Sequence, residues 1–300
     1  MNVALFIDYL TAMVKTVLLL GSTGQLGQSL ATATGACTLH APRWDLAGDF
    51  RRDLDDLPPM DVIINASAYT AVDKAEAEAD QARAINTLAP QILARYAAAR
   101  GIPLVHVSTD YVFDGMKKDP YTEDDAPNPL SVYGASKRAG EEAIIASGAP
   151  HLIFRTSWVI SAVRHNFLRT MMRLFLTRPE VRVVNDQHGA PNAADDLASA
   201  MVHALSCFQS HHSGIYHLSN TDYATWYDLA HAIWGEMHRQ TMPVVTQDLI
   251  PIATTDYPTP AQRPANSRLD PRKFSDTFGR VLPSWRDALP SLIAKAIHDL

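Results

Sequence analysis

The sequence predicts an α/β fold in which a doubly wound parallel sheet is followed by a smaller C-terminal substrate-binding domain. Two observations support this fold. Short apolar runs alternate with stretches of helical length through the first half of the chain, which is typical of βαβ units. The first run also ends in a glycine-rich turn over residues 21–27 that leads into a helical pattern. A strand, a glycine-rich turn and a helix N-terminus in this order indicate a Rossmann-type dinucleotide-binding domain.

The predicted strands of this sheet are six short apolar runs, at residues 16–20, 36–39, 61–65, 103–107, 151–155 and 181–184. The helical stretch at residues 72–100 is expected to break before Pro90, because proline lacks the N–H that a helix needs. Ligands of such sheets bind at the carboxyl ends of the strands. Those ends carry small or polar residues here, so we expect a site there, at positions 21, 66–68, 108–110 and 156–158.

The second half of the chain changes to helices and proline-rich connections. We expect helices after Pro283 and at residues 166–176, 195–208 and 225–237. We assign residues 16–158 to the NAD(P)-binding domain and residues 159–300 mainly to a substrate-binding cap, with some segments returning to the sheet. Residues 1–15 precede the first strand and are expected to form a mobile extension, with Met13 as an alternative start.

The composition excludes several classes of function. The net charge of −6, without a basic stripe, argues against nucleic acid as a partner. No apolar run reaches the length of a membrane span, and no basic segment precedes the first apolar run, so we expect neither a membrane anchor nor a signal peptide. Cys37 and Cys207 lie far apart, which suits a reducing compartment and gives no disulfide framework or zinc site. We therefore expect a cytoplasmic protein.

Tyr133 and Lys137 stand beside an alanine-rich helical stretch over residues 137–147. Residues four apart on a helix share a face, and an ammonium beside a phenol favours the phenolate. Lowering the pKa of a phenol from about 10 to about 7 takes roughly 4 kcal/mol. One charge about 4 to 5 Å away supplies roughly that much at an effective dielectric near 20. Tyr133 is therefore predicted to donate a proton near neutral pH.

The tyrosine–lysine spacing carries little weight alone, because it arises by chance in roughly one chain in four of this composition. The glycine-rich turn is also ambiguous: its Gly-x-x-Gly-x-x-Gly spacing fits an ordinary strand-to-helix turn about as well as a dinucleotide site. Polar strand ends that converge beside Tyr133 and Lys137 favour a site over a core. From these residues alone the sequence predicts a nucleotide-dependent redox site.

Several segments together resemble the dTDP-4-dehydrorhamnose reductases of the extended short-chain dehydrogenase/reductase superfamily. The resemblance runs from about residue 16 to the C-terminus and is carried by residues 24–27 (GQLG), 65–76 (NASAYTAVDKAE), 108–115 (STDYVFDG), 133–137 (YGASK), 155–159 (RTSWV) and 263–270 (RPANSRLD). It implies NAD(P)H-dependent reduction of the C4 carbonyl of dTDP-4-dehydro-L-rhamnose, in the synthesis of dTDP-rhamnose for cell-surface polysaccharide such as lipopolysaccharide O-antigen.

The resemblance also implies roles for individual residues. Tyr133 would donate the proton, Lys137 would lower its pKa and hold the nicotinamide ribose, and Thr109 would hydrogen-bond the carbonyl oxygen. Substrate contacts would come from Thr109, Asp110, Trp158, Arg263 and Arg268. The cofactor would lie against Gly21, Gly24, Gln25, Leu26, Gly27, Asp49, Phe50, Ala68, Tyr69, Thr70, Tyr133 and Lys137.

The chain departs from the family pattern in three places. Asn192 stands where threonine is usual, and Ile160 stands where tyrosine is common, so we expect both to retune the sugar pocket. The third departure is that residues 1–15 have no counterpart in the family. In some members a Mg²⁺ ion joins subunits through glutamates. The matching positions here are Ser29, Asp195 and Lys295, which do not suit Mg²⁺. We therefore expect no metal, and a monomer or a metal-independent homodimer.

Two other functions occur on the same fold. A nucleotide-sugar dehydratase would carry a glutamate after Asp110, and this chain has Tyr111 there. A non-catalytic regulatory subunit of the methionine adenosyltransferase beta type would not need the set of Thr109, Tyr133, Lys137 and Trp158 that is intact here. Both are therefore less favoured than a reductase.

NADPH is predicted to serve at least as well as NADH. NAD-selective sites place an acidic residue at the end of the second strand, where it bonds the ribose hydroxyls and repels a 2′-phosphate. Here that position is His40, and Arg43 follows to meet a phosphate. The ratio of kcat/KM values for the two cofactors measures this preference. A ratio that favours NADH tenfold would contradict it.

Overall fold

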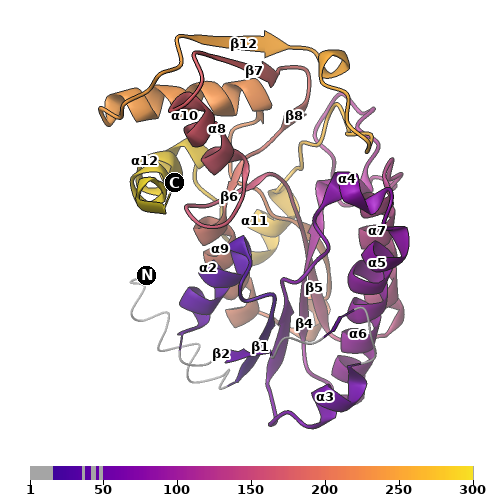
Figure 1. Cartoon of the computed structure of the whole chain (residues 1–300). Helices are drawn as coiled ribbons and strands as arrows, with labels where there is room; N and C mark the ends of the chain where they lie inside the picture. The colour runs from indigo at the N-terminus through magenta and orange to yellow at the C-terminus, as the bar shows by residue number, and fades with distance from the viewer. Residues whose placement is uncertain (1–15, 36–37, 42–44, 47–49, 300) are drawn as a thin grey trace.

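The computed structural model describes residues 16–35, 38–41, 45–46 and 50–299. Its centre is a six-stranded sheet of order β10-β5-β4-β3-β1-β2, and every pairing in it is parallel (Figure 1). The strands are β1 (Val17–Leu20), β2 (Thr38–His40), β3 (Val62–Asn65), β4 (Leu104–Thr109), β5 (His151–Thr156) and β10 (Gly214–His217). The predicted doubly wound α/β fold is confirmed.

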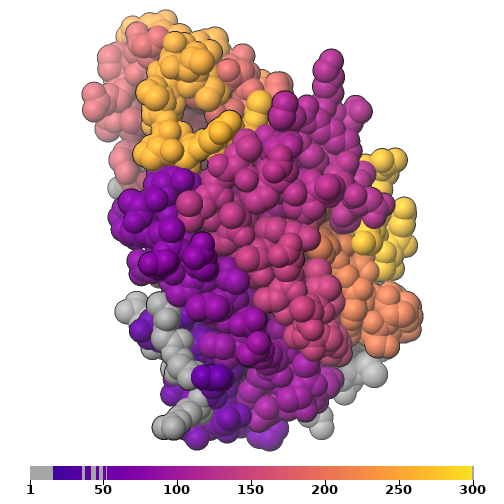
Figure 2. Space-filling view, turned by 90° about the vertical axis from the view of Figure 1, so that its right-hand side faces the viewer, coloured from indigo at the N-terminus to yellow at the C-terminus, as the bar shows by residue number. Residues whose placement is uncertain are grey.

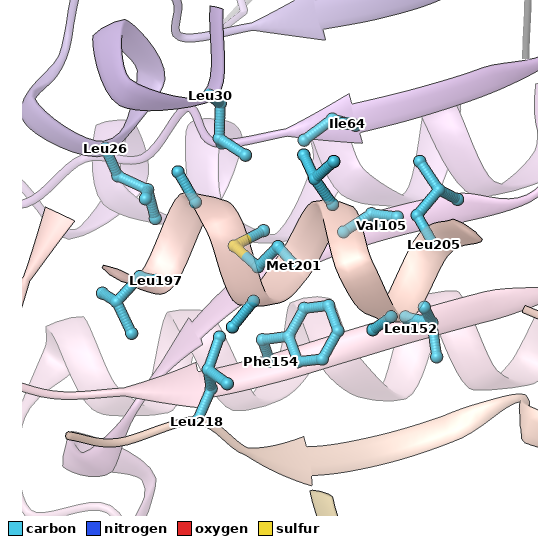
Figure 3. Packing of buried hydrophobic residues seen from close by; sticks show 14 of the residues in the cluster. Leu26, Leu30, Ile64, Val105, Leu152, Phe154, Leu197, Met201, Leu205 and Leu218 are labelled. Atoms are coloured by element: carbon cyan, nitrogen blue, oxygen red, sulfur yellow. The ribbon is translucent and has the colours of Figure 1, made fainter. Parts of the chain in front are cut away.

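Helices cover both faces of the sheet, because the strands are apolar on both sides (Figure 1). One face carries α2 (Gln25–Thr34), α9 (Ala194–Ser206) and α11 (Arg272–Phe278), which pack on side chains such as Leu19 and Ile64. The other face carries α3 (Arg51–Asp55), α6 (Ala89–Arg100) and α7 (Val132–Ala146), which pack on Leu18 and Ile63. Figure 3 shows Met201 of α9 between the sheet and α2.

The long helical stretch before β4 is divided differently from the prediction. It comprises α4 (Val72–Ala75), α5 (Ala79–Arg83), a π-helical segment η2 (Ala84–Leu88) and α6. The break falls between α4 and α5. Pro90 instead occupies the first turn of α6, directly after the π-helical segment, where its missing N–H is tolerated.

The cap lies above the sheet in Figure 1 and has its own apolar core. It contains α8 (Phe167–Phe175), α10 (Trp226–Arg239), α12 (Trp285–Ala296) and the parallel pair β7 (Glu180–Val184) and β12 (Asp248–Ile252). Two short pairings join it to the sheet region: β6 (Val159–Ile160) with β9 (Asn192–Ala193), and β8 (His188–Gly189) with β11 (Ala224–Thr225). Short 3₁₀ turns are η3 (Asp110–Val112), η4 (Ser210–His212), η5 (Thr254–Asp256) and η6 (Ile297–Asp299).

Two predicted elements need correction. The run at residues 181–184 was expected in the main sheet, but it belongs to β7 in the cap. Its burial alternates along the strand, as suits a strand with one covered face, whereas the central strands are buried on both faces. The sixth strand of the main sheet is β10, which was not predicted. The helix expected at residues 137–147 begins earlier, at Val132, because the Ser131 hydroxyl caps it by accepting a hydrogen bond from the Gly134 N–H.

Within the described part of the chain, no helix combines the length and the apolar character that crossing a membrane requires.

Met201→Ala is predicted to lower the free energy of unfolding by about 2 to 4 kcal/mol, because it leaves a cavity in a closely packed core. The matched control is Met116→Ala, whose side chain is 84% exposed and should change stability by less than about 0.5 kcal/mol. Urea denaturation of the three proteins measures both values. Equal losses in the two variants would contradict the packing described here.

Candidate functional site

A cavity of about 550 Å³ lies at the carboxyl ends of β1, β3, β4 and β5. Twelve of the predicted site residues line it: Gly21, Gly24, Gln25, Leu26, Gly27, Ala68, Thr70, Thr109, Asp110, Tyr133, Lys137 and Trp158. These residues come from the glycine-rich turn, three strand ends and the first turns of α7. The structure thus brings together most of the residues that the sequence singled out.

The glycine-rich turn fits a phosphate-bearing ligand. A Cβ at Gly21 would lie 2.6 Å from the Ala66 backbone, and a Cβ at Gly27 would lie 1.9 Å from the Gly21 carbonyl oxygen, so both positions require glycine. Gly24 precedes α2 without a side-chain cap. The first residues of this ten-residue helix line the cavity, so its N–H groups are placed where they can hold an anion.

Tyr133 is held next to Thr109 and Asp110. Its hydroxyl is hydrogen-bonded to that of Thr109, which also donates to Asp110 Oδ1 at 2.9 Å. Tyr111 packs edge-on against the Tyr133 ring, with centroids 5.6 Å apart. Helix α7 can approach this closely because residue 134 is glycine: a Cβ there would lie 2.2 Å from the Tyr111 carbonyl oxygen. A phenol and an alcohol therefore lie side by side in the cavity lining.

The ionisation of Tyr133 differs from the prediction. Burial raises its pKa to about 12, the hydrogen bond with Thr109 acts in the opposite direction, and the charge of Asp110 adds to the rise. The expected lowering by Lys137 is wrong for this structure. The Lys137 Nζ atom donates to the Val107 carbonyl at 2.6 Å and lies 3.2 Å from His106 Nε2, so its interactions are made with β4.

Trp158 forms the opposite wall in an unusual backbone conformation. Its φ of 42° lies in the left-handed region, which a tryptophan adopts only under tertiary constraint. Its ring stacks on Trp226 with centroids 3.6 Å apart and planes 12° apart. Gly189 makes room for the indole, since a Cβ there would lie 2.6 Å from the ring. The orientation of Trp158 is therefore set by the cap.

The two departures from the family pattern lie behind the cavity wall. Asn192 is fully buried, and its amide donates to the Ser157 and Ala190 carbonyls at 2.7 and 2.9 Å. Ile160 is buried in the core of the cap. Neither side chain is among those that line the cavity. Asn192 is linked to the cavity through Ser157, a lining residue beside Trp158, so its expected effect on the sugar pocket would be indirect.

Other predicted residues lie apart from the cavity lining. Arg263 pairs with Asp73 of α4 at 2.9 Å, and Arg268 donates to Asn266 Oδ1 at 2.8 Å. Figure 2 shows the cap resting on the surface of the N-terminal half. Three further residues predicted near the cofactor are not among those that line this cavity: His40 is exposed at the end of β2, Phe50 is buried in the core beneath the sheet, and Tyr69 donates to Glu78 at 2.5 Å. Arg43 and Asp49 fall outside the described residues.

Arg164 lines the cavity and was not predicted. Its Nε donates to the Thr23 carbonyl at 2.8 Å, so a cation from the cap reaches over the glycine-rich turn. Ser161 makes a second such link by donating to Gln25 Oε1 at 2.8 Å. An arginine in an irregular loop gives no sequence signal of this kind, because the contact depends on how the cap folds back.

Two of the three positions that match the metal bridge of some family members contact each other. The Ser29 hydroxyl donates to Asp195 Oδ1 at 2.6 Å, which links α2 to α9. Among the described residues, no three histidine, cysteine or acidic side chains are grouped closely enough to hold a metal ion.

Comparison with known proteins gives concordant matches. The family model described as "RmlD substrate binding domain" matches residues 15–297. The chain is 42% identical over 284 residues to the dTDP-4-dehydrorhamnose reductase of Escherichia coli (strain K12), covering 90% of this chain and 94% of that protein. The corresponding protein of Sinorhizobium fredii is 41% identical, with 91% and 95% covered.

Solved structures agree. The dTDP-4-dehydrorhamnose reductase of Bacillus anthracis str. Ames, in complex with NADP, superposes with a TM-score of 0.85 at 32% identity, covering 94% of this chain and 100% of that chain. The orthologue from Clostridium acetobutylicum also gives a TM-score of 0.85 at 32% identity, with 93% and 98% covered.

The stability of the protein is predicted to depend on the buried carboxyl of Asp110. Burial raises the pKa of Asp110 from its usual 3.8 to about 7, against opposing hydrogen bonds from Ser267 and Thr109. The folded state therefore favours the uncharged acid. The protonated carboxyl contributes fully to the free energy of unfolding below about pH 4, and this contribution is lost as the pH rises to about 7. The free energy of unfolding of the wild type, measured against Asp110→Asn, should fall by on the order of 2 to 4 kcal/mol over this range. If the free energy of unfolding varied with pH in the same way in both proteins, the prediction for Asp110 would be contradicted.

Proposed function

Because the chain belongs to the family described as "RmlD substrate binding domain", we propose that it is a dTDP-4-dehydrorhamnose reductase. It would reduce the C4 carbonyl of dTDP-4-dehydro-L-rhamnose to give dTDP-L-rhamnose. The observation that carries the proposal is that Thr109, Tyr133 and Lys137 line one cavity together with the glycine-rich turn at residues 21–27, which can hold a phosphate group. We place the enzyme in the cytoplasm, on the path to cell-surface polysaccharide.

The glycine-rich turn fits a nicotinamide dinucleotide, which would supply the hydride when bound. The backbone of residues 21–27 and the start of α2 would hold its pyrophosphate, and Arg164 would add a positive charge there. A relative from Bacillus anthracis is described in complex with NADP, which supports NADPH as the cofactor, with NADH also accepted. Residues 16–158 would provide most of this binding, and the cap would contribute Arg263 and Arg268 to the substrate site and hold Trp158 in place.

The proton would come from Tyr133. As the carbonyl is reduced, negative charge develops on its oxygen, and the Tyr133 hydroxyl transfers its proton there. Thr109 would turn its hydroxyl proton from Asp110 Oδ1 to the same oxygen and donate a hydrogen bond to it. Lys137 would stabilise the resulting phenolate with its charge and bind the nicotinamide ribose. Because burial raises the pKa of Tyr133, this help from Lys137 is needed during the reaction itself.

The substrate would lie between Tyr133 and Trp158. Trp158 presents an apolar wall that the cap has fixed in place, which suits the face of a sugar ring. Asp110, beside Thr109, would bond a sugar hydroxyl. Arg263 and Arg268 are proposed to reach the nucleotide diphosphate, which requires Arg263 to exchange its ion pair with Asp73 for the substrate.

The assay that tests the proposal follows NADPH oxidation on addition of dTDP-4-dehydrorhamnose, with the product identified by chromatography. Turnover to dTDP-rhamnose is expected. A dehydratase would act on the substrate without net oxidation of the cofactor, and a regulatory subunit would bind the cofactor without turnover. Either of these results would overturn the proposal. Sedimentation with and without EDTA tests the expected monomer or metal-independent homodimer.

Tyr133→Phe is predicted to lower kcat about 100-fold or more, because general-acid catalysis typically contributes 10² to 10⁴. KM should change little, since the ring still packs against Tyr111. The matched control is Tyr257→Phe, which removes a hydroxyl from a residue that is 61% exposed and should keep wild-type turnover. Retention of most of the activity in Tyr133→Phe would show that another group is the acid.

A further inference from the structure

A row of buried polar side chains runs behind the cavity from β3 to α7. Asn65 and Lys137 are each 1% exposed, and His106 is fully buried. Asn65 Nδ2 lies 3.1 Å from His106 Nδ1, and His106 Nε2 lies 3.2 Å from Lys137 Nζ. The roles given above to Tyr133, Thr109 and Lys137 do not account for Asn65 or His106. The hydrogen-bond partners of Asn65 determine which atoms in this row carry protons.

The orientation of the Asn65 amide is fixed by Ser67. Asn65 Oδ1 lies 3.1 Å from the Ser67 backbone nitrogen and 2.5 Å from the Ser67 hydroxyl. A backbone N–H can only donate, so the atom that faces it must be the amide oxygen. The amide NH₂ of Asn65 therefore faces His106 and donates to it.

This donation determines the tautomer of His106. Nδ1 accepts the hydrogen bond from Asn65, so it carries no proton, and a neutral imidazole then carries its proton on Nε2. The neutral form is the expected one, because burial, with the charge of Lys137 adding to it, holds the pKa of His106 well below its usual range. The Nε2–H group points at Lys137 Nζ. An ammonium has only donors, whereas an uncharged amine has a lone pair that can accept this hydrogen bond.

We propose that His106, held by Asn65 as the Nε2–H tautomer, is a positioning residue that donates a hydrogen bond to the uncharged Lys137 amine and so sets the pH at which Lys137 gains its charge. The Val107 carbonyl holds the same amine in place as an acceptor, at 2.6 Å. The inference rests on the proposed function only where activity is used to detect the charge of Lys137. It concerns an interaction within this chain and is independent of which sugar is reduced.

Other ionisable groups also lie near Lys137. Burial lowers the pKa of Lys137 to about 8, and Glu141, one turn along α7, opposes this. The charge of Glu141 is largely compensated, because it accepts hydrogen bonds from Arg155 at 2.8 and 2.7 Å and pairs with Arg138 at 3.0 Å. Tyr133 on the same helix face is uncharged near neutral pH, and Asp110 lies beyond it. The hydrogen bond from His106 therefore lowers the pKa of Lys137 further, toward neutrality.

The first experiment is a pH profile of kcat. Activity requires charged Lys137, so it should fall as the pH rises through the pKa of this residue. In His106→Phe the donor is lost, and in His106→Gln the amide oxygen can accept from the ammonium. In both variants the fall of kcat at high pH, here called the basic limb, should move up by about one pH unit. A hydrogen bond of ordinary strength changes the protonation equilibrium of Lys137 about tenfold. Asn65→Asp should move it the same way, because a carboxylate accepts from Nδ1 and reverses the tautomer.

The matched control is His217→Gln. His217 is also a fully buried histidine of the central sheet, but its Nδ1 bonds the Tyr121 carbonyl at 2.9 Å, and it is not among the cavity-lining residues. Its variant should keep the basic limb at the wild-type pH. A limb that stays in place in His106→Gln and His106→Phe, or that moves equally in His217→Gln, would overturn the proposal.

The second experiment needs no activity. In protein labelled with ¹⁵N-histidine, the signals lost in His106→Gln identify His106 by difference. The proposal expects an unprotonated Nδ1 and a protonated Nε2 at neutral pH, and a reversal of the two in Asn65→Asp. A protonated Nδ1 in the wild type would refute it. If the protein reduced no sugar nucleotide, the proposed function would fail while the tautomer remained measurable.

Discussion

The close approach of α7 to the backbones of two other segments is the constraint on which the site depends. At Gly134 a Cβ would lie 2.2 Å from the Tyr111 carbonyl oxygen, and at Gly140 it would lie 2.2 Å from that of Asn86. Side chains at these two positions would push the helix away from the sheet. Tyr133 and Lys137 would move with it, since both belong to the same helix. The geometry of the acid is therefore decided by residues that have no chemistry of their own.

The same helix face carries a buried charge network that supports the site from below. Glu141 is completely buried and is bound by Arg155, Arg138 and the Ser108 hydroxyl. Removing one partner would leave an uncompensated buried charge, which is far more costly than the pair is stabilising. This arrangement fixes α7 against β4 and β5, directly beneath the strand ends that carry Thr109 and Thr156. Stability and positioning are here supplied by one set of contacts.

The sequence was sufficient to predict the sheet and the residues around the glycine-rich turn, because these follow from local patterns. Apolar strands and glycines have meanings that depend little on distant parts of the chain, whereas the Tyr133–Lys137 spacing gained its meaning from the polar strand ends beside it. The ionisation of Tyr133 was not predictable, since it depends on burial and on which way Lys137 turns. Arg164 and the strand β10 were missed for a related reason: their roles come from where the second half of the chain returns to the first.

The path of the chain between sheet and cap limits how the cavity can open. After β5 the chain enters the cap, returns for α9 and β10, leaves again for α10 and β12, returns for α11 and ends in the cap with α12 (Figure 1). A hinge between two lobes works when few segments cross it, because each crossing must bend at the same place. Here many crossings would have to bend together. Access to the cavity therefore depends on local displacement of side chains and loops at its rim, such as that of Arg164. The two parts should also unfold as a single cooperative unit.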